Sequence, residues 1–165
     1  WAAFCPAEPD LFPGSLAYNL RIAKQDATDE ELIAAIKAAG GESLFNALGN
    51  DLNIDLFNRG HTLLSAVEGS YISLARALLK QSSLIILDEP IANRNPAAKA
   101  QLLETFNTLK GKSTVLFTSH DQELIQQADK VVILDKGAVV YAGPIPDQST
   151  QQSQPAAPQE NLPNG

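Results

Sequence analysis

The sequence lacks several features that would place it in common protein classes. It contains no methionine and a single cysteine, Cys5, so no disulfide can form within the chain. This cysteine usage is typical of a reducing compartment. No apolar run approaches the roughly 18 residues that cross a membrane as a helix. The first residues do not have the pattern of a secretory signal, so we expect neither a membrane span nor a leader in this sequence.

Positive charge is also scarce. The chain has 12 Lys and Arg residues against 19 Asp and Glu residues, a net charge of −7. Proteins that bind nucleic acid gather basic side chains on one face, so we expect no nucleic-acid partner. Hydrophobic residues make up 44% and charged residues 19% of the 165 positions, which is usual for a globular domain with a sizeable core.

The phosphate-binding motif G-x-x-x-x-G-K-[ST] is missing as well. The most similar string is Gly111-Lys112-Ser113-Thr114. A phosphate-binding loop follows a strand and precedes a helix, whereas this string follows a predicted helix and precedes a predicted strand. We therefore interpret Gly111 as the C-cap of that helix and Lys112 as a cation that is favourable near its end.

The residues that are present predict an α/β domain. Capping boxes at Thr28 and Ser65 mark two helix starts, and Asn95-Pro96 marks a third. Alternation of helices and strands favours a largely parallel core sheet. The predicted helices cover 15–20, 29–39, 43–48, 65–80, 96–109 and 121–128, and the predicted strands cover an opening segment, 83–88, 114–118, 131–134 and 138–142.

Two of these strands end in residues capable of chemistry. Four apolar residues at 84–87 precede Asp88 and Glu89, and the strand at 114–118 is followed by His120. Open parallel sheets bind ligands at the carboxyl ends of their strands, so the three side chains should converge. This predicts metal-assisted phosphoryl chemistry, with one carboxylate for a cation and one for a water. The alternatives are a strand end entering a loop for the acids, and a capping or surface histidine.

The same residues give the chain a resemblance to a known family. Residues 64–79, the strand LIILDEP at 84–90, a D-loop position at 92–95 and His120 stand in the order found in nucleotide-binding domains of ATP-binding cassette (ABC) transporters. Residues 8–20 look like the segment after the Q-loop in exporter-type members. The resemblance covers residues 1–143.

The resemblance implies a fold and a function. The fold is a P-loop NTPase-like ABC ATPase core with a mostly parallel sheet and a helical subdomain at about 13–80, without the N-terminal part that carries the Walker A loop. We expect residues 144–165, rich in Pro and Gln, to be a disordered tail. The implied function is ATP binding and hydrolysis with Mg²⁺ to power export. The implied partners are a second nucleotide-binding domain and a transmembrane domain, at the cytoplasmic face of the inner or plasma membrane.

The resemblance also assigns roles to residues. Asp88 would bind Mg²⁺, Glu89 would polarise the attacking water, and His120 would contact the γ-phosphate. A degenerate signature, Ser65-Ala66-Val67-Glu68, would face the ATP of the partner domain. Because the phosphate loop is absent, we expect this stretch alone to be inactive.

Several positions depart from the family pattern. Ala66 and Val67 replace glycines, and the β-branched Val67 obstructs close backbone approach. Glu68 stands where glutamine is usual. At about 5 Å and an effective dielectric near 20, its repulsion of a phosphate charge is roughly 3 kcal/mol, against about 0.3–1 kcal/mol gained by helix capping. Ala7 occupies the Q-loop glutamine position, and Asn95 the D-loop aspartate position, where an N-cap role explains it equally well.

Three readings remain open at this point. In a heterodimer the poor signature gives one hydrolytic and one mainly structural site, and in a homodimer it gives slow turnover. A catalytically inactive pseudo-ATPase that serves as a dimerisation or docking module is the first alternative. A soluble, non-transport ABC ATPase is the second, which the acidic charge and the exporter-like residues 11–15 disfavour. We interpret His61 as a surface residue with no role.

Overall fold

The computed structural model describes residues 2–57, 64–90 and 95–146. They form two compact units, one ending at Gln127 and one beginning at Ala128. None of the helices in these described ranges is long and apolar enough to cross a membrane.

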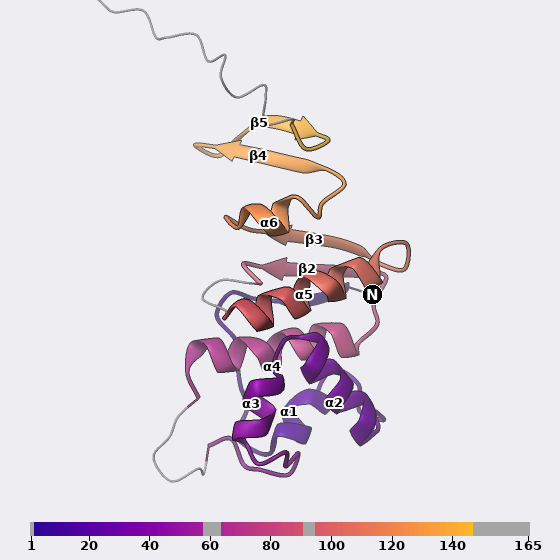
Figure 1. The fold of residues 1–165 in the computed structure, drawn as a ribbon, viewed down its shortest axis with the longest axis vertical. Helices are drawn as coiled ribbons and strands as arrows, with labels where there is room; N and C mark the ends of the chain where they lie inside the picture. Colours follow the sequence, from indigo (N-terminus) through magenta and orange to yellow (C-terminus); the bar gives the residue numbers. More distant parts are fainter. Residues whose placement is uncertain (1, 58–63, 91–94, 147–165) are drawn as a thin grey trace, which may run out of the picture. The chain divides into compact units, whose positions relative to one another are not determined.

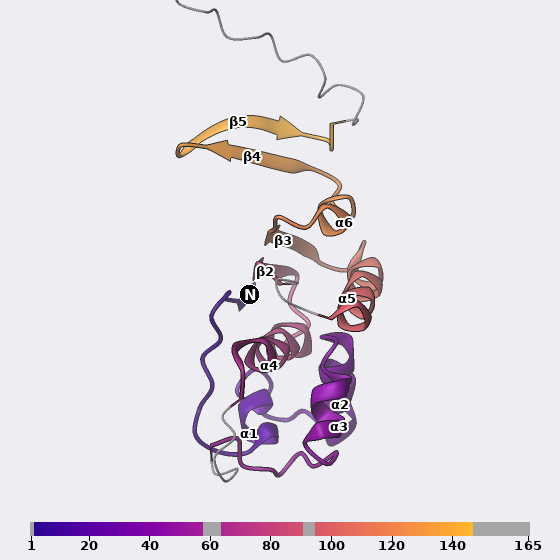
Figure 2. The ribbon, with the colours of Figure 1, turned by 60° about the vertical axis from the view of Figure 1, so that its left-hand side comes forward.

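The first unit contains a helical part. Figures 1 and 2 show three helices gathered beside a longer one: α1 (Leu16–Arg21), α2 (Asp29–Ala38) and α3 (Glu42–Ala47) beside α4 (Ala66–Leu79). The capping boxes predicted at Thr28 and Ser65 are both formed, which explains where α2 and α4 begin. Leu20, Leu32 and Leu74 are fully buried between these helices. Each such side chain contributes about 1.5–3 kcal/mol by leaving water.

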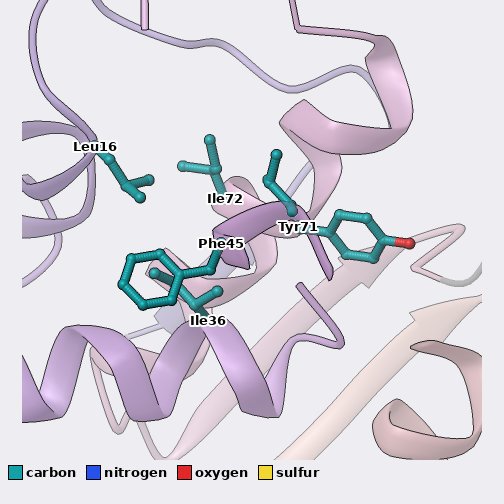
Figure 3. Close-up of a pocket in the computed structure, with 6 residues that line it drawn as sticks. Leu16, Ile36, Phe45, Tyr71 and Ile72 are labelled. Atoms are coloured by element: carbon teal, nitrogen blue, oxygen red, sulfur yellow. The ribbon is translucent and has the colours of Figure 1, made fainter. Parts of the chain in front are cut away.

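A small apolar pocket lies where the four helices meet. Figure 3 shows Leu16, Ile36, Phe45 and Ile72 around it, one side chain from each helix. Its empty volume is about 190 Å³, including space open to solvent. The residues that line it are apolar apart from the hydroxyl of Tyr71, so it is a packing seam of the helical part.

A buried polar cluster ties the loop before α1 to α4. The Asn19 side chain, fully buried, accepts the Phe12 N–H (2.9 Å) and donates to the carbonyl of Phe12 (2.8 Å). The Arg76 guanidinium donates to the Asn19 side-chain oxygen (2.5 Å) and main-chain oxygen (2.7 Å), and lies 5.4 Å from the Phe12 ring centre. Burial lowers the pKa of Arg76 from its ordinary value. The cluster fixes the entrance to α1 from a residue 57 positions away in sequence.

The core sheet of this unit has three parallel strands. They are β1 (Ala2–Cys5), β2 (Leu84–Asp88) and β3 (Thr114–Thr118), in the order β1-β2-β3. Cys5 and Leu87 lie opposite one another and are buried on the face that the helices cover. Phe4 and Leu116 lie on the other face, and each is 60% exposed. Because side chains alternate along a strand, Asp88 and Thr118 share this more exposed face.

Two further helices accompany the sheet, and Figure 1 shows α6 beside β3 and α5 alongside β2. They are α5 (Pro96–Leu109), whose Phe106 stacks on Phe117 of β3 at 5.9 Å, and α6 (Gln122–Ile125). The prediction of Asn95 as N-cap is confirmed, since its side chain accepts the N–H of Ala98 at 2.8 Å. The predicted helix 121–128 is too long: α6 ends at Ile125, and Leu124 is its one fully buried residue.

Gly111, which was predicted as the C-cap of α5, lies one residue beyond the cap. Lys110 is the capping residue, and Gly111 follows it with φ at +75°, a left-handed value that suits glycine. The N–H groups of Lys112 and Ser113 donate to the last carbonyl of α5, that of Leu109. This string therefore closes a helix and does not form a phosphate loop.

The second unit is a β-hairpin. Strands β4 (Val131–Asp135) and β5 (Ala138–Gly143) pair antiparallel, and Lys136 and Gly137 between them both have positive φ. That is the backbone of the tight turn whose twist matches a hairpin. Three predictions fall outside the described residues: most of the tail predicted at 144–165 (residues 147–165), His61 and positions 92–94 of the D-loop.

Candidate functional site

The candidate site lies at the carboxyl ends of β2 and β3. Parallel pairing sets Asp88 opposite Thr118, so the residues that follow both strands leave the sheet at the same edge. His120 Nε2 lies 3.4 Å from Glu89 Oε1. Glu89 directly follows Asp88, so the structure brings together the three residues that the sequence predicted. We call Asp88, Glu89, Thr118 and His120 the rim.

Thr118 is the rim residue that the sequence reasoning missed. Its hydroxyl donates to Asp88 Oδ1 at 2.5 Å. The hydroxyl oxygen of Thr118 accepts the N–H of Glu89 at 3.1 Å, and the Thr118 carbonyl oxygen accepts the same N–H at 3.2 Å. The sequence does place a threonine at the last position of the strand. The contact with Asp88 could have been predicted if the register of the two strands had been known.

The backbone of Glu89 has an unusual conformation. Its φ is +46°, in the left-handed region that costs a non-glycine residue about 1–2 kcal/mol. The shared hydrogen bond of its N–H to the two oxygens of Thr118 offsets part of that cost. Its side chain is 27% exposed, so the carboxylate remains accessible at the rim.

His120 presents its imidazole to solvent beside Glu89. Its side chain is 98% exposed. The capping alternative does not describe it, because Asp121 is the N-cap of α6 and accepts the Leu124 N–H at 3.1 Å. Asp121 is in turn held by Lys99 of α5 at 2.6 Å. This hydrogen bond raises the pKa of Lys99 and lowers the pKa of Asp121.

At the start of α4, where the degenerate signature was predicted, Ser65 and Glu68 form hydrogen bonds with each other. The Glu68 carboxylate accepts the Ser65 N–H at 2.7 Å and the Ser65 hydroxyl at 2.8 Å. The Glu68 N–H donates to the Ser65 hydroxyl oxygen at 3.2 Å. Ala66 is exposed and Val67 is half-buried. The serine that a phosphate would need as a donor is therefore already bound to a carboxylate of its own helix.

The rim fits a cation only as part of a shared coordination shell. Among the described residues, no three His, Cys, Asp or Glu side chains are grouped so that they could hold a metal ion. Mg²⁺ is usually bound by one or two carboxylates together with waters and substrate phosphates. Asp88 supplies one such carboxylate, so the donor set suits a magnesium ion that arrives with a phosphate ligand.

Comparison with known proteins gives a consistent group of relatives. The chain is 32% identical over 136 residues to a probable multidrug resistance ABC transporter ATP-binding/permease protein of Bacillus subtilis, covering 82% of this chain and 20% of that protein. It is 34% identical over 137 residues to the glutathione/L-cysteine transport system ATP-binding/permease protein of the same organism, covering 82% and 24%. A putative export ATP-binding/permease protein of Rickettsia conorii is 29% identical over 141 residues, covering 86% and 24%.

A solved structure has the same fold. A bacterial Atm1-family ABC exporter with ATP bound superposes with a TM-score of 0.74 at 22% identity, covering 87% of this chain and 25% of that one. No family model matches the sequence. The chain spans about a fifth to a quarter of the length of the relatives described above.

Proposed function

We propose that the rim is the hydrolytic part of an ATP site that powers export across a membrane. The premise is that this chain belongs to the family of nucleotide-binding domains of exporter-like ABC transporters. The observation that carries the proposal is the 3.4 Å approach of His120 to Glu89, beside an Asp88 fixed by Thr118. Two carboxylates and an imidazole at one sheet edge are what phosphoryl transfer to water needs.

Three of the four rim residues have separate roles in this proposal. Asp88 holds the Mg²⁺ that accompanies the nucleotide, because carboxylate oxygen is a preferred ligand of that ion. Glu89 orients the attacking water and accepts its developing proton. His120, which is exposed and next to Glu89, donates a hydrogen bond to the terminal phosphate. Bound Mg²⁺ supplies charge neutralisation between the phosphates. The proposal also requires a phosphate loop, which the given sequence does not contain.

The start of α4 serves a second, composite site in the proposal. Its backbone would face the nucleotide held by a partner nucleotide-binding domain, with Ser65 as donor. Because the Glu68 carboxylate already accepts the Ser65 hydroxyl and N–H, phosphate meets an occupied donor and a like charge. The composite site to which this chain contributes its α4 is therefore weak. A heterodimer would have one hydrolytic and one mainly structural site, and a homodimer would turn over slowly.

An exposed aromatic surface supports the proposed contact with a transmembrane domain. Phe12, Tyr18 and Phe57 are 44%, 54% and 49% exposed. They come from segments joined around the start of α1, where the Leu56 N–H donates to the Gly14 carbonyl at 3.0 Å. Exposed apolar groups near one another mark interaction surfaces. We place this surface toward the transmembrane partner, at the cytoplasmic face of the membrane.

The proposal is tested in the complete protein that carries this chain, by measuring ATP binding and Mg²⁺-dependent phosphate release together. We expect Asp88→Asn to weaken binding of the Mg²⁺–nucleotide while binding without metal changes little. Asp10→Asn, on an exposed loop, is the control with the same change of charge. A complete protein that binds no nucleotide would instead establish the pseudo-ATPase alternative, in which the domain serves only to dimerise or dock.

A further inference from the structure

We propose that Thr118 is a positioning residue whose hydroxyl sets the affinity of the rim for a divalent cation bound with nucleotide. The inference rests on the proposed function. It concerns a residue that makes no contact with nucleotide in the proposed mechanism and acts through both neighbouring carboxylates.

The first step is the direction of the hydrogen bonds. An ionised carboxylate can only accept, so the single proton of the Thr118 hydroxyl is given to Asp88 Oδ1, 2.5 Å away. The hydroxyl oxygen then accepts the N–H of Glu89 at 3.1 Å. One hydroxyl thus fixes the rotamer of Asp88 and the backbone of Glu89 at the same time.

The second step is what this arrangement leaves for a ligand. Among the described residues, the hydrogen bond to the Asp88 side chain is the one that Thr118 donates to Oδ1, and it leaves Oδ2 for a ligand. With Oδ1 engaged, the carboxylate offers Oδ2 to a cation in a defined orientation. Groups that orient a metal ligand typically change metal affinity about 10- to 100-fold when they are removed.

The third step concerns Glu89. Its left-handed backbone (φ +46°) is held by an N–H shared between the carbonyl and the hydroxyl of Thr118. Without the hydroxyl, one of the two acceptors is lost and the conformation is less firmly fixed. The carboxylate that orients water then has a wider range of positions, so the turnover rate falls together with the cation affinity.

The position allows the hydroxyl to be separated from the rest of the side chain. Valine keeps the branched shape of threonine and favours strands, but it has no hydroxyl. Serine keeps the hydroxyl and lacks the methyl group. Thr114 is the matched control, because it lies on the same face of the same strand but pairs with Leu84 at the other end of β2. Thr114→Val makes the identical chemical change away from the rim.

The experiment measures phosphate release by the complete protein against Mg²⁺ concentration at saturating ATP. We expect Thr118→Val to raise the Mg²⁺ concentration for half-maximal rate about tenfold and to lower kcat about tenfold. Thr118→Ser should stay within about twofold of the wild type, since it retains the donor. Thr114→Val should match the wild type in both quantities.

A binding measurement accompanies the rates. Mn²⁺ is the probe, and its binding in the presence of ATP is followed by electron paramagnetic resonance in a Glu89→Gln background. We expect Thr118→Val to weaken Mn²⁺ binding about tenfold and Thr118→Ser to restore it. Wild-type behaviour of Thr118→Val, or equal damage by serine and valine, would overturn the role of the hydroxyl alone. A complete wild-type protein that neither binds Mn²⁺–ATP nor hydrolyses ATP would overturn the proposed function and this role together.

Discussion

The rim and the start of α4 both carry carboxylates at the end of a secondary-structure element, but the hydrogen bonds that hold these carboxylates differ. At the rim, Asp88 and Glu89 are held from the side by Thr118, and the neighbouring His120 is exposed to solvent. At the start of α4, Glu68 turns back and binds the Ser65 that precedes it. In the proposed function the first region receives a polyanion with its cation, whereas the second already contains the Glu68 carboxylate.

This difference shows that a capping box and a phosphate site compete for the same donors. Both use the N–H groups and the hydroxyl at a helix N-terminus. A carboxylate three residues along the chain is always present at high local concentration, whereas nucleotide must diffuse in. Replacing a single side chain at each region should therefore have opposite consequences: loss of function at the rim and gain at α4.

A large effect is expected at the rim from His120→Ala. The imidazole is 98% exposed, so its loss should leave the fold intact. We expect turnover of ATP to fall about 100-fold, because one charge-assisted contact to the transition state is removed. Phosphate release by the complete protein measures this. Turnover within twofold of the wild type would show that His120 takes no part in hydrolysis and that its contact with Glu89 has no role in the reaction.

The next effect concerns the buried polar cluster that ties the loop before α1 to α4. Arg76→Met removes the donors to the buried Asn19 side chain and carbonyl. A buried acceptor that loses a charged donor costs about 1.5–3 kcal/mol. We expect the free energy of local opening of α1, from hydrogen exchange of its amides in the complete protein, to fall by about that amount.

Lys37→Met is the control for Arg76→Met. Its ion pair with Glu42 is exposed on both sides, 52% and 61%, so its loss should cost under about 1 kcal/mol. Equal effects of the two variants would contradict the claim that the buried polar cluster around Asn19 stabilises α1.

A smaller effect, of opposite sign, is expected at α4 from Glu68→Gln. Glutamine preserves the capping box but removes the negative charge. The Coulomb term of roughly 3 kcal/mol is reduced by solvent at this partly exposed position, which leaves about 1 kcal/mol. We expect nucleotide-driven dimerisation to tighten about fivefold, as measured by ATP titration of the dimer fraction. Glu30→Gln, on the exposed first turn of α2, is the control. Unchanged or weaker dimerisation would show that α4 faces no phosphate.

The smallest effect is expected from Lys99→Met, which removes the partner of Asp121 behind His120. The pKa of Asp121 is lowered in the folded state, so its contribution is present above its ordinary value and is lost as the pH falls through the lowered one. The pKa of Lys99 is raised, so its contribution is lost only as the pH rises through that raised value.

The pair is therefore complete between about pH 4 and pH 10. We expect the variant to lower the unfolding midpoint slightly at pH 7, and the difference to shrink as the pH falls toward about 3. A difference that stays constant over this range would mean that packing of the Lys99 stem, and not its charge, holds α6.

Local signals explain how much of this could be predicted from the sequence. The starts of α2, α4 and α5 were predictable because capping residues act within three or four positions. The approach of His120 to Glu89 followed from one topological rule, that parallel strands end at the same edge. The Thr118 hydrogen bonds required the register of two strands, and the contact of Arg76 with Asn19 joins residues 57 positions apart. Neither has a local signature.

The measurement that tests the account most directly is the rate of Mg²⁺-dependent ATP hydrolysis by the complete protein with Glu89→Gln, with nucleotide binding measured on the same sample. Glutamine keeps the shape of the side chain and cannot take a proton from water. The account predicts that turnover falls at least about 100-fold while binding persists. A variant that hydrolyses ATP at the wild-type rate would contradict it.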